Sequence, residues 1–159
     1  MYKNKISERY IYNKKKSLNI LIVDDDSDCS NLFMKILELR GHKVDLINEG
    51  IRCVSKCYNT NYDIIFMDYH IEDIDGDQIS LIIREDLNNK SNIFAYTGDK
   101  SINAINTFKN SGMDGALYKP IDINLLNDIM NIFEDDQDDL DKESLYRLSK
   151  KSKGNIFIF

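Results

Sequence analysis

The sequence predicts an α/β domain: a doubly wound parallel sheet of five strands with helices on both faces. Five short apolar runs alternate with segments whose apolar residues recur at helical spacing. Strands buried on both faces carry such continuous apolar runs, and strict strand–helix alternation joins parallel strands through right-handed crossovers. The expected strands are residues 19–23, 44–47, 63–67, 92–96 and 115–118.

A helix is expected after each of these strands. In the second helix, residues 50–59, Ile51 and Val54 are expected to face inward. His42, near the end of the first helix, is expected to interact with that helix's dipole rather than to bind a ligand. The apolar residues that mark the other four helices are Leu32, Phe33, Ile36, Leu37 and Leu39, then Ile79, Ile82, Ile83 and Leu87, then Ile102, Ile105 and Phe108, and finally Ile123, Leu126, Met130 and Phe133.

The composition excludes several classes of protein. With 42% hydrophobic residues and only seven Gly and one Pro, the chain is neither disordered nor fibrous. Its longest apolar run falls far short of the ~18 residues that a membrane span needs, and the basic N-terminus lacks the apolar core of a secretory signal. Three cysteines, Cys29, Cys53 and Cys57, cannot form a disulfide scaffold, so we expect reduced thiols and a cytoplasmic location.

Charge divides the chain into three parts. Residues 1–17 form a basic extension with six basic residues against Glu8, residues 18–133 form the domain with ten basic and nineteen acidic residues, and residues 134–159 form a charged tail. The acidic domain repels nucleic acid. The tail ends in an apolar tip, residues 156–159, and is too short for a winged helix or an enzyme, so no DNA-binding domain is expected.

Polar residues follow four of the five expected strands. They are Asp24, Asp25 and Asp26 after the first strand, Asp68 after the third, Thr97 after the fourth and Lys119 after the fifth. In a doubly wound sheet the ligand site lies beyond the carboxyl ends of the strands. We therefore expect these side chains to form one site.

Several carboxylates can stay ionised together only beside a cation, and Mg²⁺ is the natural occupant of such a site. Asp68 stands alone on its strand end and is available as a nucleophile, since carboxylates form acyl phosphates. Lys119 would supply a fixed positive charge and Thr97 a hydrogen-bond donor. Phosphoryl transfer needs little more than such positioning and charge neutralisation.

Five motifs occur with their spacing intact: Ile-Leu-Ile-Val-Asp-Asp-Asp at 20–26, Tyr-Asp-Ile-Ile-Phe-Met-Asp at 62–68, Asp75-Gly76, Thr97-Gly98, and Gly-Met-Asp-Gly-Ala-Leu-Tyr-Lys-Pro-Ile-Asp at 112–122. Through these motifs the chain resembles the receiver domain of two-component response regulators over roughly residues 18–133. The resemblance implies a flavodoxin-like fold with strand order 2-1-3-4-5. It also implies a signalling domain of a phosphorelay that catalyses only its own phosphorylation and dephosphorylation.

The same resemblance implies roles for the acidic residues. Asp68 would accept a phosphoryl group from the phosphohistidine of a histidine kinase or a histidine phosphotransfer protein. Asp25 and Asp68 would bind Mg²⁺ directly, or Mn²⁺ in its place, with the backbone carbonyl of His70 as a third ligand and Asp24 acting through water. The side chain at His70 and that of Asp99 would modulate the lifetime of the phosphoaspartate.

It implies roles for the residues after the fourth and fifth strands as well. Thr97, with Gly98 behind it, would bond the phosphoryl group, and Lys119 would bridge to it. The bond between Lys119 and Pro120 would be cis. Phosphorylation would then switch the binding of a separate effector protein, or of a second receiver, on the face formed by the fourth helix, fifth strand and fifth helix.

The chain departs from the family pattern in two places. Ile71 and Glu72 stand where the family usually has Met-Pro, and Ala116 stands where an aromatic residue often swings inward on activation. Ala116 is too small for that movement, so we expect Tyr96 or Tyr118 to fill the space, or the space to stay open.

The same residues admit other interpretations. A phosphatase of the haloacid dehalogenase type needs an aspartate two residues after the nucleophile; that position is His70 after Asp68, and although Asp24 and Asp26 have the spacing, the chain has no room for a cap domain. The domain could also be a phosphate shuttle or sink, or an unphosphorylated docking module. His70 itself could act as a general acid or base, although a solvent-facing loop side chain is the expected reading.

Overall fold

The computed structural model describes residues 15–135 and 142–159, and it has a single sheet in which the first five strands are parallel. The order β2-β1-β3-β4-β5 is the one expected, and a sixth strand lies beyond β5. Most of the basic N-terminal extension and part of the acidic block of the tail lie outside the described residues. The parallel strands are β1 (Asn19–Val23), β2 (Lys43–Ile47), β3 (Ile64–Met67), β4 (Asn92–Thr97) and β5 (Gly115–Tyr118).

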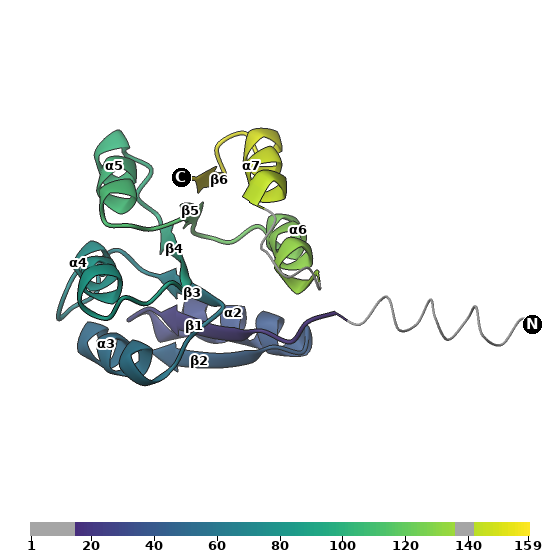
Figure 1. Cartoon of the computed structure of the whole chain (residues 1–159). Helices are drawn as coiled ribbons and strands as arrows, with labels where there is room; N and C mark the ends of the chain where they lie inside the picture. The colour runs from purple at the N-terminus through teal and green to yellow at the C-terminus, as the bar shows by residue number, and fades with distance from the viewer. Residues whose placement is uncertain (1–14, 136–141) are drawn as a thin grey trace, which may run out of the picture.

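Helices cover both faces of the sheet (Figure 1). One core lies beneath α2 and α6, and the other beneath α3, α4 and α5, because successive strand side chains point to opposite faces: Ile20 and Ile22 belong to the first core, Leu21 and Val23 to the second. The helices are α2 (Ser27–Leu39), α3 (Gly50–Asn59), α4 (Gly76–Leu81) with its continuation as the π-helix η1 (Ile82–Asp86), α5 (Ile102–Asn110), and α6 (Ile123–Glu134). Within the described part of the chain, none of the helices is long and apolar enough to span a membrane.

The expected inward face of α3 was wrong in part. Val54 packs against the core, but Ile51 is 70% exposed, and Cys53 and Cys57 are buried in its place. The reason is the start of the helix: a Cβ at Gly50 would lie only 2.3 Å from Ile74, so α3 packs against the loop between β3 and α4 with position 50 inward. Positions 50, 53 and 57 then form the buried stripe.

Four other marker residues also lie on the outside. The buried stripes of these helices are narrower than the apolar pattern suggested. Helix α2 buries Phe33 and Leu37 with the small Ser30, and α5 buries Ala104 and Phe108. The exposed residues are Leu32, Leu39, Ile102 and Ile123.

The end of the chain adds structure that the sequence did not reveal. Helix α7 (Lys142–Lys151) packs near α6, and β6 (Ile156–Ile158) pairs antiparallel with β5. A Cβ at Gly115 would lie 2.3 Å from the backbone oxygen of Phe157, so glycine permits this close pairing. Leu145 and Ile156 are both buried. The apolar tip therefore docks on the sheet edge of its own chain.

A buried polar network links the end of α6 to the amino ends of β1 and β2. Arg40 donates two hydrogen bonds of 2.8 Å to the carboxylate of Glu134, and His42 Nε2 lies 2.7 Å from the same carboxylate. The backbone N–H of Leu18 donates to His42 Nδ1, so His42 is a buried bridge rather than a simple dipole partner. Burial would raise the pKa of Glu134, but the hydrogen bonds from Arg40 and His42 outweigh it and hold that pKa below its ordinary value.

Candidate functional site

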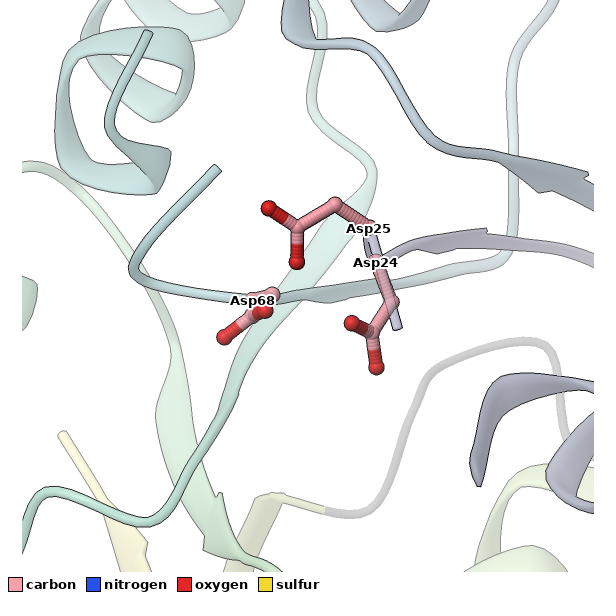
Figure 2. Close-up of side chains that lie close together, drawn as sticks. All are labelled: Asp24, Asp25 and Asp68. Atoms are coloured by element: carbon pink, nitrogen blue, oxygen red, sulfur yellow. The ribbon is translucent and has the colours of Figure 1, made fainter. Parts of the chain in front are cut away.

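Three carboxylates converge beyond the carboxyl ends of β1 and β3. Figure 2 shows Asp24 and Asp25 on the turn after β1 and Asp68 at the end of β3, and ligand oxygens of the three lie within 4.8 Å of one another. The two strands are parallel neighbours with Val23 opposite Met67, and the N–H of Asp68 donates to the carbonyl of Val23 at 2.9 Å. Their register alone therefore brings the acids together.

Burial and neighbouring charges shift the pKa of Asp68. Asp24 is 1% exposed and Asp68 8%, whereas Asp25 is exposed. Burial raises the pKa of Asp68, Lys119 lowers it and the negative charge of Asp24 raises it, and together they give a pKa of about 6. Asp24 is held in place because its Oδ1 accepts from the N–H of Asp26 at 2.9 Å. Asp26 in turn caps α2 by accepting from the N–H of Asp28.

Lys119 reaches the acids from the end of β5. Its Nζ lies 2.9 Å from Asp24 and 3.5 Å from Asp68, and it sits over the ring of Tyr96 at 5.0 Å. Burial would lower the pKa of Lys119, but the two carboxylates outweigh burial and the pKa lies above its ordinary value. The peptide bond to Pro120 is cis, as the resemblance implied.

Thr97 ends β4 beside Lys119. It is 2% exposed, its hydroxyl accepts from the N–H of Asp99 at 3.1 Å, and its carbonyl accepts from the N–H of Lys119. Hydrogen bonds from Ser101 lower the pKa of the half-buried Asp99. Gly98 faces open space, with no atom within 4 Å of where a Cβ would lie.

The loop after Asp68 returns tightly to it. A Cβ at Gly76 would lie 2.2 Å from the backbone oxygen of Asp68, so only glycine fits there. The sequence marked Gly76 as a turn residue and gave no sign of this contact. The side chain of His70 is 70% exposed and lies 4.0 Å from Asp75, which agrees with the solvent-facing reading. Glu72 is exposed, and Ile71 is buried where the family usually has methionine.

Tyr118 is the aromatic residue that faces the same side as Thr97. The two residues are opposite each other in the β4–β5 register, whereas Tyr96 belongs to the core under α2 and α6. The Tyr118 ring packs edge-on against Phe157 at 6.1 Å, and Lys100 lies over it at 5.0 Å. Its hydroxyl is buried, and no group among the described residues hydrogen-bonds to it. Position 116, where the family often has an aromatic residue, holds a fully buried alanine.

The arrangement agrees with known proteins. The family model of the response regulator receiver domain matches residues 20–131. A curated relative, the transcription factor SKN7 of Candida albicans, is 32% identical over 102 residues, or 64% of this chain. That match covers only 18% of SKN7, so the absence of a DNA-binding domain stays a prediction.

Two solved structures are similar over most of the chain. A two-component response regulator from Clostridium difficile is 26% identical with a TM-score of 0.71, covering 78% of this chain and 100% of that one. The receiver domain of the sensor histidine kinase PA1611 from Pseudomonas aeruginosa PAO1 is 26% identical with a TM-score of 0.65, covering 73% of this chain and 96% of that one. Since the family model spans well over half of the residues, the chain belongs to the response regulator receiver domain family of two-component systems.

Proposed function

We propose that Asp68 is the phosphoacceptor of this receiver domain and that a phosphohistidine of a histidine kinase or phosphotransfer protein is the donor. One observation carries the proposal: a half-buried lysine and two further carboxylates surround Asp68 at the end of its strand. Asp24 is buried there, with one carboxylate oxygen accepting from the N–H of Asp26 and the other from Lys119 Nζ. The cytoplasm, where such kinases present their phosphohistidine, is the proposed location.

The acidic set also fits a divalent cation. Three carboxylates with oxygens within 4.8 Å of one another are the hard ligands that Mg²⁺ prefers, and Mn²⁺ accepts the same ligands. We propose that Asp25 and Asp68 bind the ion directly, with the backbone carbonyl of His70, and that Asp24 acts through water. The PA1611 receiver domain, a structural neighbour, holds a magnesium ion in its active-site cleft. Bound there, the cation would neutralise charge on the transferring phosphoryl group.

The chain's own residues would perform the transfer as follows. A carboxylate oxygen of Asp68 bonds to phosphorus while the phosphorus–nitrogen bond of the phosphohistidine breaks and its electron pair returns to the imidazole. Lys119 already lies 3.5 Å from Asp68 and would neutralise the new phosphoryl oxygens. Thr97 would turn its hydroxyl from the N–H of Asp99 toward one of those oxygens, which couples the β4–α5 loop to phosphorylation. The exposed side chain of His70 and the half-buried side chain of Asp99 would set how fast water removes the phosphate.

The output surface includes the chain's own C-terminal segment. The edge of β5, between α5 and α6, is paired with β6, and Phe157 and Phe159 on that segment are 39% and 37% exposed. An effector protein or a second receiver that reads the α5–β5–α6 face would therefore meet these two rings. A phosphate shuttle would need no such contact.

A small phosphodonor tests the proposal. The intact protein is incubated with acetyl phosphate, with and without Mg²⁺, and its mass is followed. We expect one added phosphate that requires Mg²⁺ and is lost in alkali, as an acyl phosphate is. No added phosphate would favour a docking module, and continuous release of phosphate without a stable adduct would favour a phosphatase.

A further inference from the structure

The loop that carries the proposed third metal ligand is tied to a neighbouring helix. This loop joins β3 to α4 and includes His70, whose backbone carbonyl is a proposed Mg²⁺ ligand. Three residues further on, the carboxylate of Asp73 accepts two backbone hydrogen bonds from the first turn of α3. The N–H of Gly50 donates to Oδ1 at 2.8 Å, and that of Ile51 donates to Oδ2 at 3.0 Å. One side chain thus joins the loop to a second structural element.

Helix α3 receives its cap from this loop. Among the described residues, Glu49 at the N-cap makes no capping hydrogen bond with its side chain, and the first turn holds no acidic residue. The first N–H groups of a helix have no partner within it, and the positive end of the helix dipole attracts a carboxylate. Asp73 supplies both the acceptor and the negative charge. The hydrogen bonds from Gly50 and Ile51 hold the pKa of Asp73 below its ordinary value.

Packing holds the loop and the helix together beside these hydrogen bonds. Ile74 lies so close to Gly50 that a Cβ at position 50 would be 2.3 Å from it. Ile71 is buried, and the N–H of Gly76 donates to the carbonyl of Tyr69 at 2.8 Å. The loop is therefore closed at its base and attached to α3 through its middle.

The chain lacks a restraint that the family usually has at this place. Glu72 stands where proline is usual, and proline fixes φ and so limits the conformations of a loop. Glu72 is exposed and imposes no such limit. The hydrogen bonds of Asp73, the next residue, would restrain the same stretch of backbone by other means.

We propose that Asp73 is a positioning residue for the metal site, because it holds the loop on α3 so that the carbonyl of His70 is presented to the ion. Asp73 would not touch the ion and would act through the backbone between positions 70 and 73. Removing a group that orients a metal ligand typically costs about 10–100-fold in metal affinity. Since Asp73 acts at a distance of three residues, we expect a loss of about tenfold, at the low end of that range. The inference deepens the proposed function and rests on it.

The coupling must work in both directions. If the held loop favours Mg²⁺, bound Mg²⁺ favours the held loop by the same factor. The amides of Gly50 and Ile51, which donate to Asp73, should therefore exchange with solvent more slowly when Mg²⁺ is bound. In Asp73→Ala, Mg²⁺ should leave the exchange of these two amides unchanged.

An Mg²⁺ titration of the full chain and its variants, followed by amide NMR, tests the inference. Asp73→Ala should weaken Mg²⁺ binding about tenfold. Asp73→Asn should lie between that variant and the wild type, because one amide oxygen can still accept from one of the two N–H groups. Glu72→Ala is the matched control for charge, since it removes the neighbouring exposed carboxylate and should change Mg²⁺ affinity little. Equal losses in all three variants would reveal a charge effect and overturn the inference.

A second control separates positioning from stability. Asp63→Ala removes an exposed carboxylate that accepts from the N–H of Asn19 at 2.8 Å, at the amino end of β1. In chelator, Asp63→Ala and Asp73→Ala should both lower the melting temperature, but only Asp73→Ala should weaken Mg²⁺ binding. Unchanged affinity in Asp73→Ala, while Asp25→Ala loses most of its binding, would overturn this inference and leave the proposed metal site intact. A wild type that binds no Mg²⁺ would overturn both.

Discussion

Lys119 lies closer to Asp24 than to Asp68: its Nζ is 2.9 Å from the first carboxylate and 3.5 Å from the second. The lysine therefore neutralises the most buried acid of the site while remaining within reach of the acceptor. A phosphoryl group on Asp68 would add negative charge at the longer of the two contacts. The lysine is placed to follow that charge with a small movement.

Lys119→Met should both destabilise the fold and slow phosphorylation. The substitution leaves Asp24 buried beside Asp68 without a cation, which costs about 3–5 kcal/mol when a buried pair is broken. Lys109→Met is the control, because Lys109 is exposed on α5 and makes no side-chain contact with the site. Urea unfolding and the rate of phosphate addition measure the two effects. Equal unfolding free energies for the two variants would mean that the Lys119 ion pair does not stabilise the site.

Asp68→Asn should stabilise the metal-free protein in a pH-dependent way. The pKa of Asp68 is raised from 3.8 to about 6, so the folded state binds its proton more tightly than the unfolded chain does. The wild type therefore loses stability as the pH rises from about 4 to 6, whereas the asparagine variant does not. Two pKa units correspond to about 3 kcal/mol, which is the largest gain expected above pH 6.

The measurement is the free energy of unfolding in chelator at a series of pH values. A difference between variant and wild type that stays constant from pH 4 to pH 7 would mean that Asp68 ionises normally. The same variant should take up no phosphate.

Mg²⁺ should bind the unphosphorylated protein weakly and raise its melting temperature, because it relieves repulsion among the three acids. Asp25→Ala should remove most of that increase, since Asp25 is a proposed direct ligand. Glu72→Ala should remove little, because Glu72 is exposed on the loop and outside the carboxylate cluster. The chain has no tryptophan, so calorimetry or amide NMR is the measurement. Equal loss in the two variants would place the metal elsewhere.

Tyr118→Phe should stabilise the protein, by about 1 kcal/mol, because the buried hydroxyl has no partner and its removal costs no hydrogen bond. Tyr62→Phe is the matched comparison: the Tyr62 hydroxyl donates to Asp45 at 2.6 Å, so its loss should destabilise. Thermal unfolding of the two variants separates these outcomes. Destabilisation by Tyr118→Phe would mean that its hydroxyl is hydrogen-bonded in solution.

Activation should move Tyr118 and leave Ala116 in place. Thr97 and Tyr118 are opposite each other in the sheet, and Tyr118 contacts Phe157, so a shift of the Thr97 hydroxyl has a direct route to β6. With a phosphate mimic, amide shifts should therefore extend through 97–120 to 156–159. Shifts confined to the metal site would favour a phosphate shuttle or sink.

The parallel strands and the site could be predicted because both follow from short-range pattern. Apolar runs that end in Asp24, Asp68, Thr97 and Lys119 place those residues at one sheet edge once the strands are parallel. Family likeness supplied the cis bond at Pro120. Neither needed knowledge of side-chain packing.

What could not be predicted depends on packing between distant segments. Ile51 is exposed and Cys53 is buried instead, because Gly50 packs tightly against Ile74, a contact that no local pattern reveals. Strand β6 has only three residues, and its Ile158 pairs with Gly115, forty-three positions earlier, where the absence of a side chain allows the close approach. The edge-on packing of the Tyr118 ring against Phe157 likewise depends on that added strand.

The central claim, that Asp68 carries the phosphate, can be tested at the level of the single residue. The protein is phosphorylated with acetyl phosphate and Mg²⁺, reduced with borohydride, which converts an acyl phosphate to an alcohol, and digested for peptide mass spectrometry. We predict homoserine at position 68 and unchanged aspartates at 24, 25 and 26. Homoserine at any of those three positions, or at none, would contradict the account.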